Sequence, residues 1–234
     1  MPQRTKHQNV SFPSAQDTAY GYLCLPPEKK GPGLIVIQEW WGLTDHIANM
    51  TDRFAAEGFV SLAPDLYGGP TTHDSAEANE MMQNLPVEVG VKRLRGAVDF
   101  LLSQDSVTSK TIGIVGFCMG GGFALLLSNE AGDQVGATVV FYGLFTSPTA
   151  PPLHGIKSPI LGHFGDQDSY ASPEKAKEIQ QQIMDQSGIR MDLQIYPGAG
   201  HAFMNDENLL GTYDPTLAKI AWDKTIDFLK QNVK

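Results

Sequence analysis

The segment Gly116-Phe117-Cys118-Met119-Gly120 places a thiol between two glycines, where an apolar strand-like run gives way to a helix-like run of small residues. The spacing Gly-x-nucleophile-x-Gly is typical of a sharp strand-to-helix turn that lifts a reactive side chain above a sheet. A helix N-terminus and a nearby imidazole both favour the anionic form of a thiol. The pattern therefore predicts that Cys118 is a nucleophile, with simple core packing of a small residue as the alternative.

The other side chains that such chemistry needs follow later in the chain, each directly after an apolar run. Asp166 and Asp168 come after one run, and His201 comes after the next. We expect His201 to take the thiol proton and later to activate water, while a carboxylate fixes the imidazole tautomer and stabilises its cation. Of the two carboxylates we choose Asp168, which completes a Gly-x-x-Asp pattern. The order nucleophile, acid, histidine is that of the α/β-hydrolases.

A sheet must bring these residues together, and the patterning of the chain predicts one. Residues 18–25 alternate in part and predict an edge strand. Continuous apolar runs predict buried strands at 33–38, 59–64, 111–117, 137–143, 159–165 and 191–197. Helical spacing, caps and small-residue runs predict helices at 46–58, 75–84, 89–104, 121–129, 173–186 and 214–232.

The alternation of strands and helices continues to the end of the chain without a long linker. It predicts βαβ crossovers and one α/β domain over residues 1–234, in which helices flank both faces of a mostly parallel central sheet. Residues 1–10 are expected to form a loosely ordered N-terminal tail. Sites in such sheets form at the carboxyl ends of the strands, which is where the thiol, the carboxylates and the imidazole follow their apolar runs.

Composition limits the class of protein and its partners. The chain of 234 residues is 41% hydrophobic and 18% charged, which fits a globular core, and its net charge of −9 argues against nucleic acid and anionic membranes as partners. Two cysteines, no signal-like segment and no apolar run of about 18 residues predict a cytoplasmic protein. The sequence contains no metal-ligand spacing, dinucleotide fingerprint or Walker sequence, so we expect no metal or cofactor. We expect the protein to be a monomer or small homo-oligomer whose partner is a small molecule.

Five segments follow one another along the chain in this order: VIQEWWG, APDLYGG, GFCMGG, GDQD and GAGHAF. Through them the chain resembles the dienelactone hydrolase family over roughly residues 15–232. This is a branch of the α/β-hydrolases with a cysteine nucleophile. The resemblance implies a single-domain α/β-hydrolase fold with a triad of Cys118, Asp168 and His201. It also implies that the protein cleaves an ester or lactone, in the manner of a carboxymethylenebutenolidase, through a thioester on Cys118.

The same resemblance assigns further residues around the thiol. Glu39 matches a family glutamate that engages the resting thiol and helps to form the thiolate when substrate binds, and burial in its apolar loop would raise its pKa. An oxyanion hole needs two backbone N–H groups, which nominates Met119 and, by resemblance, Trp40. We expect the following residues to bind the substrate: Trp41, Met82, Tyr142, Phe203 and Asn205.

The chain departs from the pattern of dienelactone hydrolase itself, which acts on a lactone that carries a carboxylate. That enzyme is expected to grip the anion with two arginines, but residues 66–90 and 202–218 of this chain contain no Lys or Arg, and Asn205 stands about where the second would be. A buried carboxylate without a cation costs several kcal/mol. Neutral esters or lactones are therefore the predicted substrates. The predicted apolar mouth comprises Trp40, Trp41, Met81, Met82, Met119, Phe203 and Met204.

Two other classes of function stay open at the level of sequence. A relative without catalysis, or one that senses oxidants through a reactive thiol, would keep the same turn. An amidotransferase-like protein would also carry a cysteine on such a turn, but it typically has an acid two places after the histidine, where this chain has Phe203.

Overall fold

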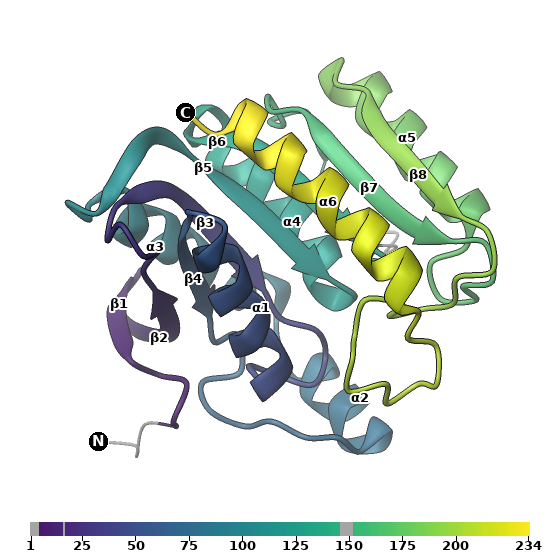
Figure 1. Ribbon diagram of the computed structural model, residues 1–234, viewed down its shortest axis with the longest axis horizontal. Coiled ribbons are helices and arrows are strands. Elements are labelled where there is room, and N and C mark those ends of the chain that lie inside the picture. Colours follow the sequence, from purple (N-terminus) through teal and green to yellow (C-terminus); the bar gives the residue numbers. More distant parts are fainter. Residues whose placement is uncertain (1–4, 16, 146–151) are drawn as a thin grey trace.

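A computed structural model describes residues 5–15, 17–145 and 152–234 of the chain, and Figure 1 shows its ribbon. Within these residues, eight strands form one sheet in the order β1-β2-β4-β3-β5-β6-β7-β8. β2 runs antiparallel to β1 and β4, and the remaining neighbours are parallel, so the predicted mostly parallel sheet is confirmed. The strands are β1 (Val10–Ser14), β2 (Asp17–Cys24), β3 (Gly31–Ile37), β4 (Val60–Pro64), β5 (Val107–Phe117), β6 (Val135–Phe141), β7 (Ile160–Gly165) and β8 (Met191–Tyr196).

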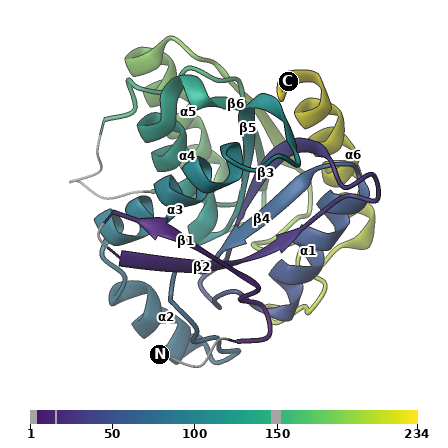
Figure 2. The same ribbon diagram turned by 90° about the vertical axis from the view of Figure 1, so that its left-hand side faces the viewer.

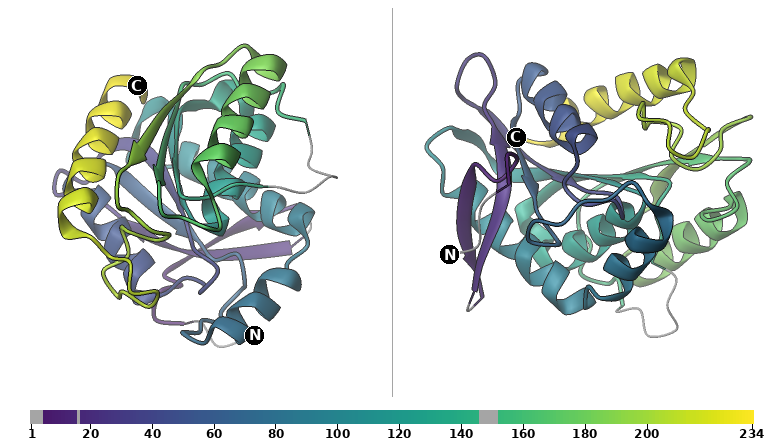
Figure 3. Two further views of the ribbon diagram at one scale, coloured as in Figure 1. Left: turned by 90° about the vertical axis from the view of Figure 1, so that its right-hand side faces the viewer. Right: turned by 90° about the horizontal axis from the view of Figure 1, so that it is seen from below.

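Helices cover both faces of the sheet, as predicted for a single α/β domain. α1 (Asp45–Ala56) and α6 (Pro215–Asn232) pack on one face. α3 (Val87–Leu102), α4 (Met119–Ala131) and α5 (Pro173–Ser187) pack on the other, and Figures 2 and 3 show the two layers on either side of the strands. A short 3-10 helix, η1 (Gly132–Gln134), follows α4. In the described part of the chain, no helix combines the length and the apolar character needed to cross a bilayer.

The helix α2 (Ser75–Gln83) differs from the others in how little of it is buried. Asp74 caps its N-terminus by accepting hydrogen bonds from the backbone N–H groups of Ala76 and Glu77. Ala78 is its buried residue, so most of the helix faces away from the core. Asn79 and Met82 extend from this helix toward the same edge of the sheet as the predicted site.

The register of the central strands aligns the predicted site residues at one edge. Ile37 of β3 pairs with Gly116 of β5, so the loop after β3 and the turn after β5 begin side by side. Phe141 of β6 pairs with His163 of β7, and β7 and β8 end together in the same way. β3, β6 and β7 are parallel and buried on both faces, which explains their continuous apolar sequences.

The outermost strand differs from the sequence prediction. Residues 18–25 were expected to form the edge, but β2 pairs with β1 on one side and β4 on the other. β1 is the edge strand instead, and it contains Pro13, which has no N–H to donate to a further strand. The prediction was wrong because β1 has two apolar residues besides Pro13, Val10 and Phe12, and these are too few to mark a strand in the sequence.

The segment before β1 makes specific contacts. Residue His7 pairs with Asp45 through its ring nitrogen at 2.6 Å, and the side chain of Gln8 donates to the buried Asp65 carboxylate at 2.8 Å. Residues 1–4 of the predicted tail lie outside the described residues.

Candidate active site

The turn that carries Cys118 joins β5 to α4 and is backbone-strained. Cys118 has φ 53° and ψ −120°, a conformation that side-chain-bearing residues rarely adopt. The glycines around it are required by close approach: a Cβ on Gly116 would overlap the carbonyl oxygen of Gly120, and a Cβ on Gly120 would lie 2.5 Å from the backbone oxygen of Gln38. A Cβ on Gly143 would likewise overlap the Cys118 carbonyl. The sequence pattern therefore reflects a turn pressed against two neighbouring strand ends.

Cys118, His201 and Asp168 form one continuous chain of contacts. The Cys118 sulphur lies 3.2 Å from His201 Nε2, and His201 Nδ1 lies 2.8 Å from Asp168 Oδ2. The other carboxylate oxygen accepts hydrogen bonds from the backbone N–H groups of Tyr170 at 2.8 Å and Ala171 at 2.9 Å. A base within reach of the nucleophile, oriented by a third group, is the arrangement that nucleophilic catalysis needs.

The surroundings of His201 favour its cation. Burial lowers its pKa, but the hydrogen bonds to Asp168 and Cys118 outweigh burial and raise the pKa to about 10. Burial also raises the pKa of Asp168, yet the hydrogen bond from His201 and those from the backbone hold it below its usual value. A carboxylate beneath an imidazolium is the pairing that stabilises negative charge on the adjacent sulphur.

Two other residues near these strand ends hold the scaffold. Asp166, the carboxylate not chosen, accepts a hydrogen bond from the Gly198 N–H at 2.7 Å and so ties the turn after β8 to the loop after β7. His163 is fully buried, and burial lowers its pKa to about 3. Its ring nitrogens pair with the hydroxyls of Tyr196 at 2.8 Å and Thr225 at 3.0 Å. Both serve the loops and the core rather than the thiol.

Glu39 is buried beside this chain, with 1% of its surface exposed. Asn205 Nδ2 donates to Glu39 Oε2 at 2.6 Å, and the Tyr142 hydroxyl donates to Oε1 at 3.5 Å. Burial raises the pKa of Glu39, opposed by the nearby His46 and by the Asn205 hydrogen bond. The carboxylate that the family resemblance places on the resting thiol is thus held here by Asn205 and Tyr142, while the sulphur pairs with His201.

A cavity of about 390 Å³ opens at the thiol. Among the described residues that line it there is no Lys, Arg, Asp or Glu. Its ionisable groups besides two tyrosines are Cys118 and His201. The lining residues are Trp40, Asn79, Met82, Cys118, Met119, Tyr142, Gly143, Leu144, Tyr170, Ala171, His201 and Leu210.

The cavity gathers some of the predicted substrate-binding residues and not others. Met82 and Tyr142 line it. Trp41 lies in the core and packs edge-on against Trp40 at 4.8 Å between ring centroids. Phe203 is fully buried against Tyr142, and Asn205 contacts Glu39. Of the wider predicted mouth, Trp40 and Met119 line the cavity, whereas Met81 lines a separate groove and Met204 is buried.

Sequence reasoning did not nominate several lining residues. Tyr170 is 65% exposed, and its ring lies 5.1 Å from that of His201. It follows Asp168 by two positions, so its place beside the triad could have been inferred. Asn79 and Leu210 come from α2 and from the loop before α6. The family resemblance pointed to both segments, 66–90 and 202–218, as the places of the missing arginines, but no pattern singled out these two residues.

The two expected oxyanion donors lie next to the thiol. Met119 is the first residue of α4, where backbone N–H groups have no partner within the helix. Trp40 lies in the loop after β3, and its carbonyl accepts a hydrogen bond from the Tyr67 hydroxyl at 3.1 Å. Tyr67 belongs to the APDLYGG segment, and its hydroxyl also lies 3.5 Å from the Met119 sulphur. It therefore bridges the two segments that carry the expected donors.

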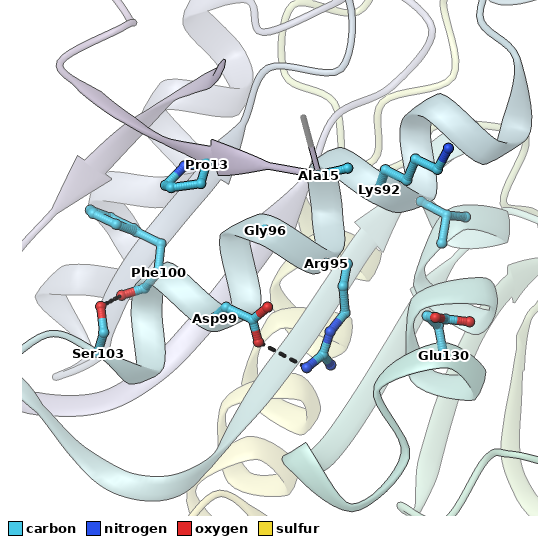
Figure 4. Close-up of a pocket in the computed structure, with 10 residues that line it drawn as sticks. Pro13, Ala15, Lys92, Arg95, Gly96, Asp99, Phe100, Ser103 and Glu130 are labelled. Carbon is cyan, nitrogen blue, oxygen red and sulfur yellow. Dashed lines mark hydrogen bonds and ion pairs between the residues drawn. The ribbon is translucent and has the colours of Figure 1, made fainter. Parts of the chain in front are cut away.

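A second cavity, of about 570 Å³, lies elsewhere (Figure 4). It lies between the end of β1, α3 and the end of α4, and Arg95 and Asp99 form an ion pair on its wall at 2.8 Å. It is away from the carboxyl ends of the parallel strands, and the described residues that line it include no cysteine or histidine. The smaller cavity at Cys118 is therefore the better candidate for a reaction site.

The chain is similar to known proteins over nearly its whole length. The sequence model of the dienelactone hydrolase family matches residues 19–233. Protein usf of Aquifex pyrophilus is 32% identical over 231 residues, covering 96% of this chain and 98% of that protein. A protein of Aquifex aeolicus (strain VF5), provisionally named carboxymethylenebutenolidase, is 30% identical and covers 97% of this chain and 99% of its own.

A solved structure agrees with these matches. A dienelactone hydrolase-like promiscuous phosphotriesterase from metagenomic libraries is 25% identical and superposes with a TM-score of 0.82, covering 96% of this chain and 97% of that one. The matched length includes the turn after β5 and the loops after β7 and β8, which carry the triad candidates.

Proposed function

The chain belongs to the dienelactone hydrolase family, and we propose that it hydrolyses a neutral ester or lactone through a thioester on Cys118. The observation that carries this proposal is the chain of contacts from the Cys118 sulphur through His201 to Asp168, at 3.2 and 2.8 Å, on the wall of a cavity. Family membership favours this reaction over an amidotransferase-like one.

The reaction takes place in two steps. His201 takes the thiol proton, the sulphur bonds to the substrate's carbonyl carbon, and the bond from that carbon to the alcohol oxygen breaks as His201 returns the proton to the leaving oxygen. Water then attacks the thioester while His201 accepts its proton. The carbon–sulphur bond breaks, the acid leaves, and Cys118 regains the proton. Asp168 keeps the ring oriented and stabilises its cation throughout.

The oxyanion of each tetrahedral intermediate needs two fixed donors. The backbone N–H groups of Met119 and Trp40 are proposed for this role, because one begins α4 beside the thiol and the other lies in the adjacent loop. The Tyr67 hydroxyl supports the Trp40 backbone through its carbonyl. Glu39 is proposed to take part in activating the thiol when substrate binds, since it is a buried carboxylate whose partner Tyr142 also packs against His201.

The lining of the cavity supports a neutral substrate. None of the described residues on its wall carries a cation that could pair with a substrate carboxylate, apart from His201, which already pairs with Asp168. Apolar walls from Trp40, Met82 and Leu210 suit an alkyl or aryl group. We expect kcat/KM to be higher for a neutral ester than for a matched ester that carries a carboxylate. An equal or higher value for the charged substrate would contradict this part of the proposal.

A phosphotriester is a second candidate substrate class. The same uncharged wall would accept a neutral triester, and the structurally similar phosphotriesterase shares 25% identity with this chain. The sulphur would then bond to phosphorus as an alkoxide or aryloxide leaves, and water would later release the phosphodiester. An aryl dialkyl phosphate assayed beside the aryl esters tests this candidate.

Replacement of the thiol tests the mechanism directly. Cys118→Ala should reduce hydrolysis of activated aryl esters to the background rate, while Cys24→Ala, at the end of β2, should leave it unchanged. Mass spectrometry of the wild type mixed with a slowly hydrolysed ester should show one acyl group on Cys118. Full activity in Cys118→Ala would reject the proposal. A reactive thiol without turnover of any ester would favour a redox-sensing role instead.

A further inference from the structure

The His46 side chain is buried in an unusual way. It lies in the first turn of α1, and 1% of its side-chain surface is exposed. Its Nδ1 pairs with Asp206 Oδ1 at 2.9 Å. Its Nε2 is buried, and within the described residues it has no hydrogen-bond partner. Burying a ring nitrogen without a hydrogen-bond partner costs folding free energy. We therefore looked for a role of His46 that would offset this cost.

Asp206 lies in a short segment that reaches Glu39. The neighbouring Asn205 is 3% exposed, and its Oδ1 accepts a hydrogen bond from the backbone N–H of Glu207 at 3.0 Å. That bond fixes the direction of the amide, so its Nδ2 faces Glu39 and donates to Oε2 at 2.6 Å. The segment is therefore held at two adjacent residues, by α1 through Asp206 and by the buried carboxylate through Asn205.

Charge links the same groups. Besides burial, His46, the hydrogen bond from Asn205 and His201 lower the pKa of Glu39, and Glu207 raises it. The Tyr142 hydroxyl faces the other carboxylate oxygen. His46 binds Asp206, and the adjacent Asn205 donates to Glu39, so α1 is joined to the carboxylate through two neighbouring residues of one loop.

We propose that His46 is a positioning residue for Glu39: by binding Asp206 it holds the 205–207 segment, so that Asn205 keeps Glu39 in place and Cys118 stays paired with His201. The inference rests on the proposed function, which gives Cys118 and Glu39 their roles in the reaction. His46 itself does not line the cavity and touches no reacting atom.

Three variants separate positioning from simple packing. His46→Leu fills the space but cannot bind Asp206. His46→Asn keeps an amide N–H near the position of Nδ1 and serves as the conservative rescue. His73→Asn is the matched control, because His73 is 62% exposed and lies 3.5 Å from Glu207 in the same cluster. Should His46→Leu fail to fold, Asp206→Asn removes the charge from the other partner, whose side chain is 53% exposed.

The main measurement is the rate at which iodoacetamide alkylates Cys118 between pH 5 and 9, followed by mass spectrometry of the full chain. Cys24 interferes little, since burial and Asp52 raise the pKa of its thiol to about 11. In His46→Leu, a displaced Glu39 should release Tyr142, which packs against His201, and so loosen the pairing of His201 with Cys118. Loss of that imidazole partner should move the alkylation profile to higher pH and slow alkylation at pH 7 about tenfold. Ester kcat should fall by a similar factor, with KM changed less than about threefold.

The alkylation profiles of the variants distinguish a positioning role of His46 from simple packing. The proposal is supported when His46→Leu, or Asp206→Asn in its place, shifts the alkylation profile while His46→Asn and His73→Asn stay close to the wild type. An unshifted profile overturns it, even if the melting temperature drops, because the residue would then only support packing. A shifted profile in a protein that hydrolyses no ester would keep the positioning role and reject the proposed function.

Discussion

Asp168 and Glu39 are two buried carboxylates at the same sheet edge, and their surroundings push them in opposite directions. Asp168 is 3% exposed and Glu39 1% exposed, so burial alone does not distinguish them. Asp168 receives two backbone N–H groups and a histidine, and its pKa is lowered. Glu39 receives one amide at 2.6 Å and one hydroxyl at 3.5 Å, and its pKa is raised.

The difference shows that donors decide the charge of a buried carboxylate. Three good donors, one of them cationic, more than offset the loss of water around Asp168. Glu39 has too few donors for that, so its proton is held more tightly. Two carboxylates with separated proton affinities in one site are the pattern expected when one stabilises a cation and the other exchanges a proton. Four experiments test whether the two carboxylates differ in this way.

The largest effect is expected for Asp168→Asn. The amide would still accept the Tyr170 and Ala171 N–H groups but would present an N–H to His201, which forces the wrong tautomer at Nε2. We expect kcat/KM for an aryl ester to fall about 10³–10⁴-fold, as in serine hydrolase triads. Asp166→Asn is the matched control, since it keeps the oxygen that accepts the Gly198 N–H. Comparable losses in both variants would show that Asp168 has no special role.

A smaller loss is expected for Glu39→Gln. The amide oxygen can still accept from Asn205, so the loop should hold its shape while the exchangeable proton is lost. We expect kcat to fall about a hundredfold, within the range of general acid–base effects. Steady-state kinetics on the same ester would measure it. A kcat equal to that of the wild type would show that Glu39 is a structural carboxylate with no part in proton exchange.

Tyr67→Phe probes the other side of the Glu39 loop. The variant removes the hydrogen bond from the Tyr67 hydroxyl to the Trp40 carbonyl and leaves the ring in place. One neutral hydrogen bond contributes about 1 kcal/mol, so kcat should fall about fivefold with little change in KM. An unchanged kcat would indicate that the Trp40 backbone is held without Tyr67.

The smallest effects, a few degrees in melting temperature, should have opposite signs. The pKa of Glu39 is raised on folding, so its ionisation costs stability as pH rises above its unfolded value of about 4.3. The melting temperature of Glu39→Gln should therefore gain on that of the wild type as pH increases. The pKa of Asp168 is lowered, so its contribution is present above about pH 3.9 and is lost as pH falls through the folded value.

Calorimetry of both variants between pH 3 and 7 tests these signs. The melting temperature of Asp168→Asn should fall further below that of the wild type as pH rises out of the acid range. Each kcal/mol corresponds to about 2–4 °C for a chain of this size. Parallel curves for the two variants would contradict the opposite pKa directions.

The sequence was sufficient for the parts of the molecule that depend on local patterns. Apolar runs located the central strands, and the spacing around Cys118 located the turn, because a tight turn and a buried strand both require particular residues nearby in the chain. The edge strand β1 was missed since a strand of five residues that contains Pro13 carries little pattern. The distinction between Trp40 in the cavity wall and Trp41 in the core was also beyond reach, because it depends on the direction of neighbouring side chains.

Contacts between distant segments were the hardest to foresee. His46 and Asp206 are 160 positions apart, and Asn205 and Glu39 are 166 apart. Neither pair has a spacing rule, because each depends on how two loops fold over the sheet edge. Asn205 was expected to face the substrate, whereas its amide faces Glu39. Residues that belong to a sequence motif could therefore be predicted, whereas the residues that hold them in place could not.

The weak attachment of α2 has a consequence for how such a protein diversifies. The helix buries Ala78 but contributes Asn79 and Met82 to the cavity wall. We expect its exposed residues to change with little effect on the turn at Cys118, since Ala78 is the residue that α2 buries. Selection for a new substrate therefore has a target that costs little stability. Changes in this one exposed helix would then alter which substrates fit the cavity, while the residues around Cys118 stay the same.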